Sequence, residues 1–190
     1  MAEATLVVGL GNPGPSYAEN RHNFGFMVAD ALFARTGGGT WQEKFHGRFV
    51  RVAVGGRPVF LLKPMKYMNV SGRSLARAAG FFQIAADRII VVHDELDLPF
   101  GTVRIKIGGG AGGHNGVESC IADLGDPGFV RVRMGIGRPP HGDATDFVLS
   151  DFSVDERPAM TEIIAHGADA VENVIGHGAK AAMNSFNKRS

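Results

Sequence analysis

Two stretches of the chain are continuously apolar, and three others alternate between apolar and polar residues. The run at 6–9, and the run of Ile and Val within the stretch 88–93, are typical of strands buried on both faces of a sheet. The alternation at 45–54, 103–107 and 130–135 predicts strands with one polar face. In the predicted strand at 130–135, Arg131 and Arg133 lie on that polar face. Gly55-Gly56 separates 45–54 from a further strand at 58–63, so these two form a predicted hairpin.

Apolar residues recur at helical spacing between these strands. The spacing predicts helices at 22–35, 70–82 and about 117–124, and then at 144–149, 155–167 and 168–186. Asn69 is the expected N-cap of the second helix. Strands that alternate with helices predict an α/β fold. We expect a single domain over 1–190, with three layers and a mixed, twisted central β-sheet flanked by helices.

Composition adds limits on the class of protein. The 190 residues are 44% hydrophobic and 21% charged, as in an ordinary globular domain. The net charge of +1 excludes a grossly basic nucleic-acid binder but permits a local basic patch. No run approaches the roughly 20 apolar residues of a membrane span, and Cys120 is the single cysteine. We therefore expect a cytoplasmic protein without membrane contact, in which Cys120 is a buried small side chain.

The glycines after the first strand match a dinucleotide-binding fingerprint. Gly9, Gly11 and Gly14 have the G-x-G-x-x-G spacing, but Pro13 and Pro15 interrupt the turn that should open a helix. Helical periodicity starts only near position 22. We therefore interpret the glycines as a tight strand exit and predict no bound cofactor.

A histidine and a carboxylate are candidates for general base chemistry. His22 stands at a predicted helix start, and Asp94 follows the second buried strand. The ends of buried strands are where sites of α/β proteins assemble. A carboxylate that bonds one imidazole nitrogen fixes the tautomer, so the other nitrogen can take a proton from water.

Three asparagines stand in rigid backbone settings, where an amide can donate to a developing oxyanion. They are Asn12, Asn69 and Asn115, and each alone is typical of a cap or a turn. Together with His22 and Asp94 they favour a site that activates water. No Gly-x-Ser-x-Gly elbow is present, which disfavours a serine nucleophile.

A metal centre is an alternative interpretation of His93, Asp94 and Asp97. Adjacent residues of an extended segment point to opposite faces, so these ligands converge poorly, and we predict no metal. Lys106 and Arg133 lie in neighbouring strand patterns and could bind a phosphate. A solvated strand face explains that pair equally well.

Several motifs together resemble the bacterial peptidyl-tRNA hydrolase family, in order and over nearly the whole chain. The motifs are Gly9-Leu-Gly-Asn-Pro-Gly14, Tyr17, Arg21-His-Asn23, Lys63-Pro64, Met68-Asn69-x-Ser-Gly72, His93-Asp-Glu-Leu-Asp-Leu-Pro99 and Gly112-Gly-His-Asn-Gly116. The resemblance implies a monomeric, metal-independent enzyme that cleaves the ester between a peptide and the tRNA 3′ end. Free tRNA then returns to translation.

The resemblance also implies residue roles. His22 is the expected base and Asp94 its orienting carboxylate, while Asn12, Asn69 and Asn115 position substrate and water. Tyr17, Met68 and His114 match residues around the peptide and the terminal nucleotide. Lys106 and Arg133 match the pair associated with the tRNA 5′ phosphate at the acceptor stem.

Three positions depart from the family pattern. Ala111 replaces a frequent histidine, Lys66 a common threonine and Phe100 a second proline. These changes affect the expected shape of the cleft and leave the base and the amides intact. The Gly/Pro-rich region 137–151 is a hypothetical lid. A non-catalytic RNA-binding module is the rival functional class, which the His22 and Asp94 pair disfavours.

Overall fold

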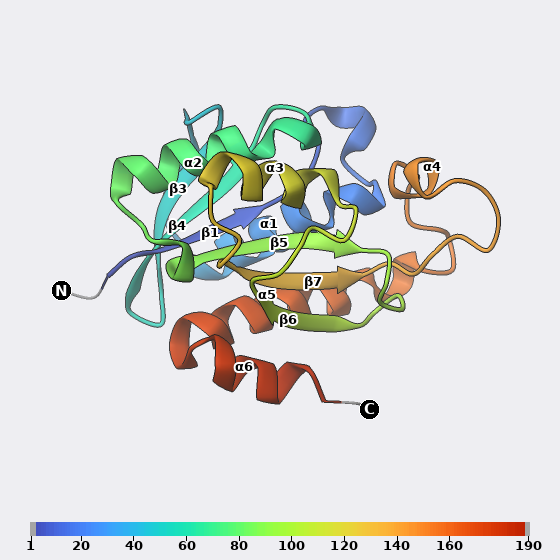
Figure 1. Ribbon diagram of the computed structural model, residues 1–190. Helices are drawn as coiled ribbons and strands as arrows, with labels where there is room; N and C mark the ends of the chain where they lie inside the picture. The colour runs from blue at the N-terminus through green and yellow to red at the C-terminus, as the bar shows by residue number, and fades with distance from the viewer. Residues whose placement is uncertain (1–2, 189–190) are drawn as a thin grey trace.

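Seven strands form one twisted sheet that runs through the centre of the molecule (Figure 1). The computed structural model describes residues 3–188. The order of the strands across the sheet is β2-β3-β4-β1-β5-β7-β6. Their bounds are β1 Thr5–Gly9, β2 Gln42–Lys44, β3 Gly47–Val54, β4 Arg57–Pro64, β5 Ile89–Glu95, β6 Val103–Ile107 and β7 Val130–Gly135.

The four central strands, β4, β1, β5 and β7, are parallel, and the outer strands pair antiparallel. Val7 of β1 is paired with Leu61 of β4 and with Ile90 of β5, so the first strand occupies the middle of the sheet. The carboxyl ends of the parallel strands therefore meet at one edge, where sites of α/β proteins assemble. The prediction of a mixed α/β sheet flanked by helices is confirmed.

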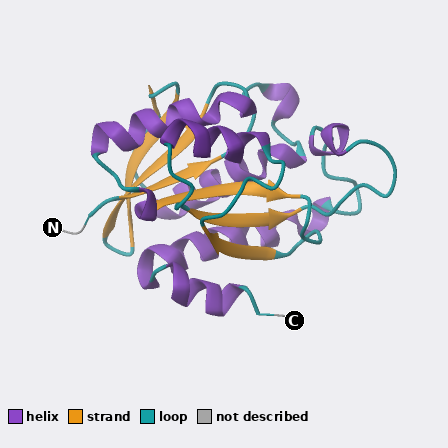
Figure 2. Ribbon diagram, in the orientation of Figure 1, coloured by secondary structure: helices purple, strands orange, loops and turns teal. Residues whose placement is uncertain are grey.

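Helices cover both faces of the sheet (Figure 2). α2 and α3 pack on one face, and α1, α5 and α6 pack on the other. The bounds are α1 Phe24–Thr36, α2 Ser71–Phe82, α3 Asn115–Leu124, α4 Ala144–Val148, α5 Met160–His177 and α6 Ala179–Phe186. Within residues 3–188, none of these helices combines the length and apolar character that a bilayer crossing requires.

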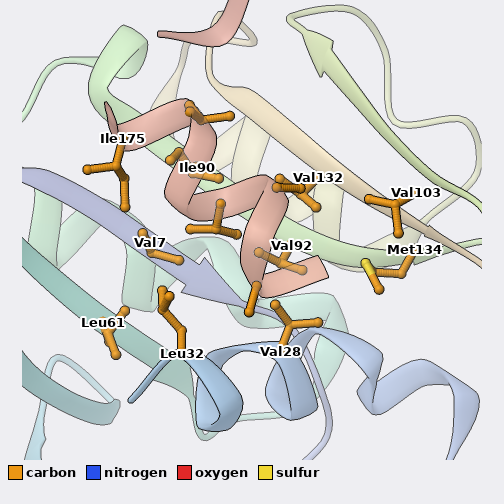
Figure 3. Close-up of a cluster of buried hydrophobic side chains, with 14 of the residues drawn as sticks. Val7, Val28, Leu32, Leu61, Ile90, Val92, Val103, Val132, Met134 and Ile175 are labelled. Carbon is orange, nitrogen blue, oxygen red and sulfur yellow. The ribbon is translucent and has the colours of Figure 1, made fainter. Parts of the chain in front are cut away.

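Alternating side chains of the strands divide the core into two layers. The layer under α1 and α5 includes Val7, Val28 and Ile90, all 0–1% exposed (Figure 3). On the same side α1 approaches β1 closely, because a Cβ on Gly9 would lie 2.3 Å from the Gly25 carbonyl oxygen. The first glycine of the apparent nucleotide fingerprint thus serves helix packing, and α1 begins only at Phe24, well beyond the turn.

The starts of the first two long helices differ from the prediction. Arg21–Asn23 form a 3-10 turn before α1, and a second 3-10 turn, Met68–Val70, precedes α2. The N-cap of α2 is Val70, which makes no side-chain capping bond, so the prediction of Asn69 as N-cap is wrong. The extra turn moves the helix start past Asn69.

The hairpin and the C-terminal helices also differ. β3 begins at Gly47, not at position 45, because Phe45 and His46 form a turn after the additional strand β2. α5 continues through the predicted boundary at 167–168 and ends before Gly178, which has φ +88°. Gly167 lies inside this helix, where a Cβ would come within 2.7 Å of Met134.

Arg131 shares a strand face with Arg133, as predicted, but its side chain is not on the surface, because it is buried at 2% exposure. Its guanidinium donates to the carbonyl oxygens of Gly109, Gly110 and Pro127 at 2.8, 2.6 and 2.9 Å. Burial of a charged group requires such hydrogen bonds. Arg131 therefore anchors the glycine-rich loop before α3. Cys120 is fully buried, as predicted, and burial raises the pKa of its thiol to about 12.

Candidate active site

A cavity of about 290 Å³ opens beyond the carboxyl ends of β1 and β5, where α3 begins and α4 passes. It brings together most of the predicted site residues, from five separate segments: Asn12, His22, Met68, Asn69, Asp94, His114 and Asn115. Its other lining residues are Tyr67, Glu95, Leu96, Gly112, Gly113, Ala144, Thr145, Val148 and Leu149. Tyr17, Lys106 and Arg133 are not among the lining residues.

Asp94 lies between two imidazole rings at the end of β5. His22 Nδ1 is 3.0 and 2.9 Å from the two carboxylate oxygens, and His114 Nε2 is 2.8 Å from Oδ1. The Asp94 side chain is 2% exposed, and those of His22 and His114 are 10% and 9% exposed. Two ring nitrogens thus satisfy a buried carboxylate, which is costly to bury without partners.

The backbone at the start of α3 fixes the tautomer of His114. Its Nδ1 accepts hydrogen bonds from the N–H groups of Gly116 and Val117, at 3.1 and 3.2 Å. A nitrogen that accepts carries no proton, so Nε2 bears it and donates to Asp94. His114 therefore caps α3 and holds Asp94 at the same time.

The electrostatics of the site keep Asp94 ionised. Burial alone would raise the pKa of Asp94, but the adjacent rings of His114 and His22 outweigh it and hold the pKa well below its usual range. His93, on the opposite side of the strand, is also buried, and its Nδ1 donates to the Asp94 carbonyl oxygen at 2.7 Å. Burial and then the neighbouring His114 lower the pKa of His93 to about 3, so this ring is neutral.

Three hydrogen bonds hold Asn12 in the turn that follows β1. Asn23 accepts from the backbone N–H of Asn12 at 2.8 Å and donates to its carbonyl oxygen at 3.0 Å. The Asn12 side-chain oxygen accepts from the backbone N–H of Met68 at 2.7 Å. Because that oxygen is engaged, the end of the amide that remains for a ligand is the NH₂ group.

Asn69 and Asn115 lie in the two segments that complete the cavity wall. Asn69 is in the 3-10 turn before α2, and Asn115 is the first residue of α3. Both asparagines are exposed. Met68, in the same turn as Asn69, is buried, and its side chain lies against the start of α3. Backbone contact is close here, since a Cβ on Gly116 would lie 2.5 Å from Met68 Sδ.

Arg21 fixes the segment that carries α4 beside the site. Its guanidinium donates to the Asp151 carbonyl oxygen and to Glu156, both at 2.6 Å, and lies 4.1 Å from the Phe147 ring centroid. The region 137–151, predicted as a lid, thus supplies one wall of the cavity through α4.

Lys106 and Arg133 lie on the adjacent strands β6 and β7. Arg131 is paired with Lys106, and Arg133 is two residues farther along, so the two predicted phosphate-binding side chains share one face. Arg133 Nε donates to Glu95 at 3.0 Å, and Glu95 lines the cavity. Tyr17 ends a separate 3-10 turn and is half-buried.

The metal interpretation of His93, Asp94 and Asp97 does not match the geometry. Within residues 3–188, the metal-ligating side chains that converge are instead those of His22, Asp94 and His114, whose ligand atoms lie within 4.8 Å of one another. These atoms are joined directly by hydrogen bonds of 2.8–3.0 Å. Because the carboxylate oxygens accept in these bonds, the ring nitrogens that face Asp94 carry protons and offer no lone pair to a cation there.

Several site residues were not identified from the sequence. Asn23, which holds Asn12, stood next to His22 in a motif and could have been singled out there. Tyr67, Leu96 and Val148 form apolar parts of the cavity. Their only sequence signal was ordinary hydrophobicity, which does not separate a cleft from a core.

Comparison with known proteins identifies the family. The family model described as "Peptidyl-tRNA hydrolase" matches residues 6–190. The chain belongs to the peptidyl-tRNA hydrolase family. Membership assigns the chain to the hydrolases that act on peptidyl-tRNA, and the resemblance inferred from its motifs is confirmed.

Similar peptidyl-tRNA hydrolases are found in several bacteria. That of Sorangium cellulosum is 50% identical over 187 residues, covering 97% of this chain and 84% of its own. That of Geobacter sulfurreducens is 47% identical over 184 residues, covering 97% and 95%. The crystal structure of peptidyl-tRNA hydrolase from Acinetobacter baumannii superposes with a TM-score of 0.91 at 39% identity, covering 100% of this chain and 97% of that one.

Proposed function

We propose that His22 is the general base that activates water in the hydrolysis of peptidyl-tRNA, with Asp94 as its orienting carboxylate. The observation that carries this proposal is the position of Asp94, which is buried and bonded to both His22 and His114. Since the carboxylate holds the proton of His22 on Nδ1, Nε2 is left with a lone pair. That nitrogen can take a proton from a water molecule in the cavity.

The reaction is attack of this water on the carbonyl carbon of the ester between peptide and ribose. A carbon–oxygen bond forms to water while Nε2 takes the proton, and negative charge develops on the carbonyl oxygen. The NH₂ group of Asn12 is the donor for that charge. When the ester bond breaks, the protonated His22 gives its proton to the ribose oxygen, and the new carboxylic acid of the peptide loses its own proton to solvent.

Asn69 and Asn115 position the substrate and the water at the rim of the cavity, and Met68 and Tyr17 contribute to the peptide side. His114 acts on the site through Asp94, since both its ring nitrogens are already bonded. Neutral amides suit this work because they can donate and accept without a change of charge.

Lys106 and Arg133 bind the 5′ phosphate of the tRNA at the acceptor stem in this proposal. The support is their shared strand face and the link from Arg133 through Glu95 to the cavity. Phosphate contacts of this kind position a substrate without reading its sequence, which suits an enzyme that acts on many tRNAs.

The decisive test is release of an N-acetylated amino acid from tRNA by His22→Ala, with His177→Ala as an exposed control. We expect His22→Ala to lose release by about 10²-fold or more while its tRNA affinity changes little. Retained turnover in His22→Ala would contradict the proposal. If a chelator abolished turnover by the wild type, the protein would instead be a metal hydrolase. If the wild type bound tRNA but released no amino acid from it, the protein would be a non-catalytic RNA-binding protein.

The same assay tests selectivity for blocked substrates. We expect the cavity to contact the peptide bond, so that free aminoacyl-tRNA, with a charged α-amine, reacts much more slowly than its N-acetylated form. Equal rates for the two substrates would contradict this part of the proposal.

A further inference from the structure

A second surface, next to the cavity, carries five cationic side chains. It lies where the β2–β3 turn, the end of β4 and the exposed face of α2 meet, and shallow depressions run along it. We call it the basic groove and define it by Lys44, Arg48, Lys66, Arg73 and Arg77, all of which are exposed. The function described so far does not use it.

The positive charge of the basic groove is not neutralised by the protein. Among the ion pairs of residues 3–188, none involves any of the five cations. Glu43 is the acidic side chain beside them. Desolvation and then the charges of Arg77, Lys66 and Arg73 lower the pKa of His46, which shows that three cations act on one point. In a chain with a net charge of only +1, this concentration is local.

The β2–β3 turn holds the groove in a defined shape. Phe45 and His46 have φ of 59° and 55°, a left-handed conformation that usually requires glycine or asparagine in a two-residue hairpin turn. The Phe45 ring packs against Phe49 and Phe82, with centroids 5.5 and 5.6 Å apart. The His46 carbonyl oxygen also accepts from the N–H of Met65, the residue before Lys66. Two strained residues are thus held by packing beside the cations.

The basic groove continues directly from the cavity. Lys66 precedes Tyr67, whose side chain lines the cavity and is 63% exposed. Phe81, at the far end of the groove, is 62% exposed and lies 4.1 Å from Lys44 Nζ. A polymer that leaves the cavity past Tyr67 therefore enters a surface of cations and aromatic rings.

The sheet order decides which part of the substrate reaches this surface. Lys106 and Arg133 lie on β6 and β7, whereas the groove lies beside β2, β3 and β4, on the other side of β1. Four strand intervals separate β7 from β3, a distance of about 19 Å. With the tRNA acceptor stem on the β7 side, as in the proposed function, the peptide leaves the cavity on the β4 side.

We propose that the basic groove is an extended peptide subsite that favours acidic residues of the peptide being released. The proposal rests on the proposed placement of the tRNA. An extended peptide advances roughly 3.3–3.6 Å per residue, so residues about two to six positions before the ester lie along the groove. Exposed charges of this kind chiefly raise the rate of productive association, and salt weakens their effect.

The test compares three substrates built on one tRNA: an N-acetyl-aminoacyl ester, a hexapeptidyl ester with three Glu residues, and its match with three Gln residues. The proteins are the wild type, Arg73→Glu/Arg77→Glu, and the control Arg57→Glu/Lys180→Glu, which changes the net charge equally at exposed sites away from the groove. kcat/KM is measured for each pair at low and at high salt.

For the wild type we expect kcat/KM for the Glu peptide to exceed that for the Gln peptide by about fivefold at low salt. The ratio falls to about one in the groove variant and persists in the control variant, while the N-acetyl substrate reacts alike with both variants. A wild-type ratio of one overturns the proposal. The proposal is also overturned if the groove variant loses as much kcat/KM on the N-acetyl substrate as on the Glu peptide. That result would assign the surface to RNA binding. Failure of the catalytic assignment is separate, since it appears as peptide release by His22→Ala.

Discussion

The Asn12 side-chain oxygen accepts a 2.7 Å hydrogen bond from the backbone N–H of Met68, which ties the end of β1 to the turn before α2. This bond orients the amide, because it leaves the NH₂ group as the end that can donate to the substrate. A structural contact between two distant segments thus sets the orientation of the amide to which the proposed mechanism gives the oxyanion.

Asn12→Asp separates the two roles of this side chain. The new carboxylate can still accept from Met68, but it has no NH₂ donor for the oxyanion and places a negative charge there. We expect kcat to fall by about 10²–10³-fold with little change in Tm. Steady-state kinetics and thermal unfolding check this. A kcat close to that of the wild type would show that Asn12 does not stabilise the transition state.

His114→Ala tests whether His114 acts through Asp94 or on the substrate. The change removes the Asp94 partner and the cap of α3, so we expect kcat to fall roughly 10- to 100-fold, less than the loss of a general base. We also expect a loss of about 0.5–2 kcal/mol in the free energy of unfolding. KM for N-acetyl-aminoacyl-tRNA should not change.

The control for that change is His177→Ala, which removes an exposed imidazole at the end of α5. It should match the wild type in kcat and KM. If His114→Ala instead raises KM and leaves kcat intact, His114 contacts the substrate rather than positioning Asp94.

The buried neutral His93 predicts a loss of stability in acid. Its pKa is about 3 in the folded protein against 6.5 for an ordinary histidine, so the unfolded chain binds more protons between these values. The free energy of unfolding therefore falls as pH drops from about 6.5 towards 3, by about 1.4 kcal/mol per pH unit from this group. Denaturant titrations between pH 7 and 4.5 measure that slope.

His93→Asn removes the titrating ring and keeps a side-chain donor for the Asp94 carbonyl oxygen. We expect its slope to be smaller than that of the wild type by about 1.4 kcal/mol per pH unit. His166→Asn, at an exposed position, should leave the slope unchanged. Parallel pH dependences for the wild type and His93→Asn would show that His93 does not titrate on unfolding.

A tightly packed glycine in α1 and an open one in α2 allow a paired test of how closely α1 packs on the sheet. A Cβ on Gly25 would lie 2.3 Å from the Val92 carbonyl oxygen and 2.4 Å from the Leu10 nitrogen, whereas one on Gly80 of α2 meets nothing within 4 Å. We expect Gly25→Ala to cost about 1–3 kcal/mol or more, and Gly80→Ala to gain about 0.5–1 kcal/mol. Equal Tm values for the two variants would contradict the close approach of α1 to the sheet.

The parts of the fold that follow from local patterns were predictable. The apolar runs at 6–9 in β1 and 89–92 in β5 are buried on both faces of the sheet, and Gly55-Gly56 suits the tight turn between β3 and β4. The continuation of α5 through position 167 was not predictable in the same way. Gly167 resembles a helix end in the sequence, but it is required where α5 packs against Met134.

The candidate site was predictable where a residue stood at a strand end or a helix start, and not where contacts between segments define its role. His22 and Asp94 were identified by position and are bonded in the structure. The capping of α3 by His114 and the clamp of Asn23 on Asn12 are contacts between separate segments. The left-handed turn at Phe45 and His46 was missed because it depends on tertiary packing against α2, which overrides the local preference for glycine.

The central claim is that Asp94 holds the proton of His22 on Nδ1 and leaves Nε2 free to act as the base. ¹⁵N NMR of the imidazole nitrogens measures this directly in protein labelled at histidine, with the His22 signals assigned by their loss in His22→Ala. For the neutral ring we expect a protonated Nδ1 and a bare Nε2. A neutral ring with its proton on Nε2 would contradict the account.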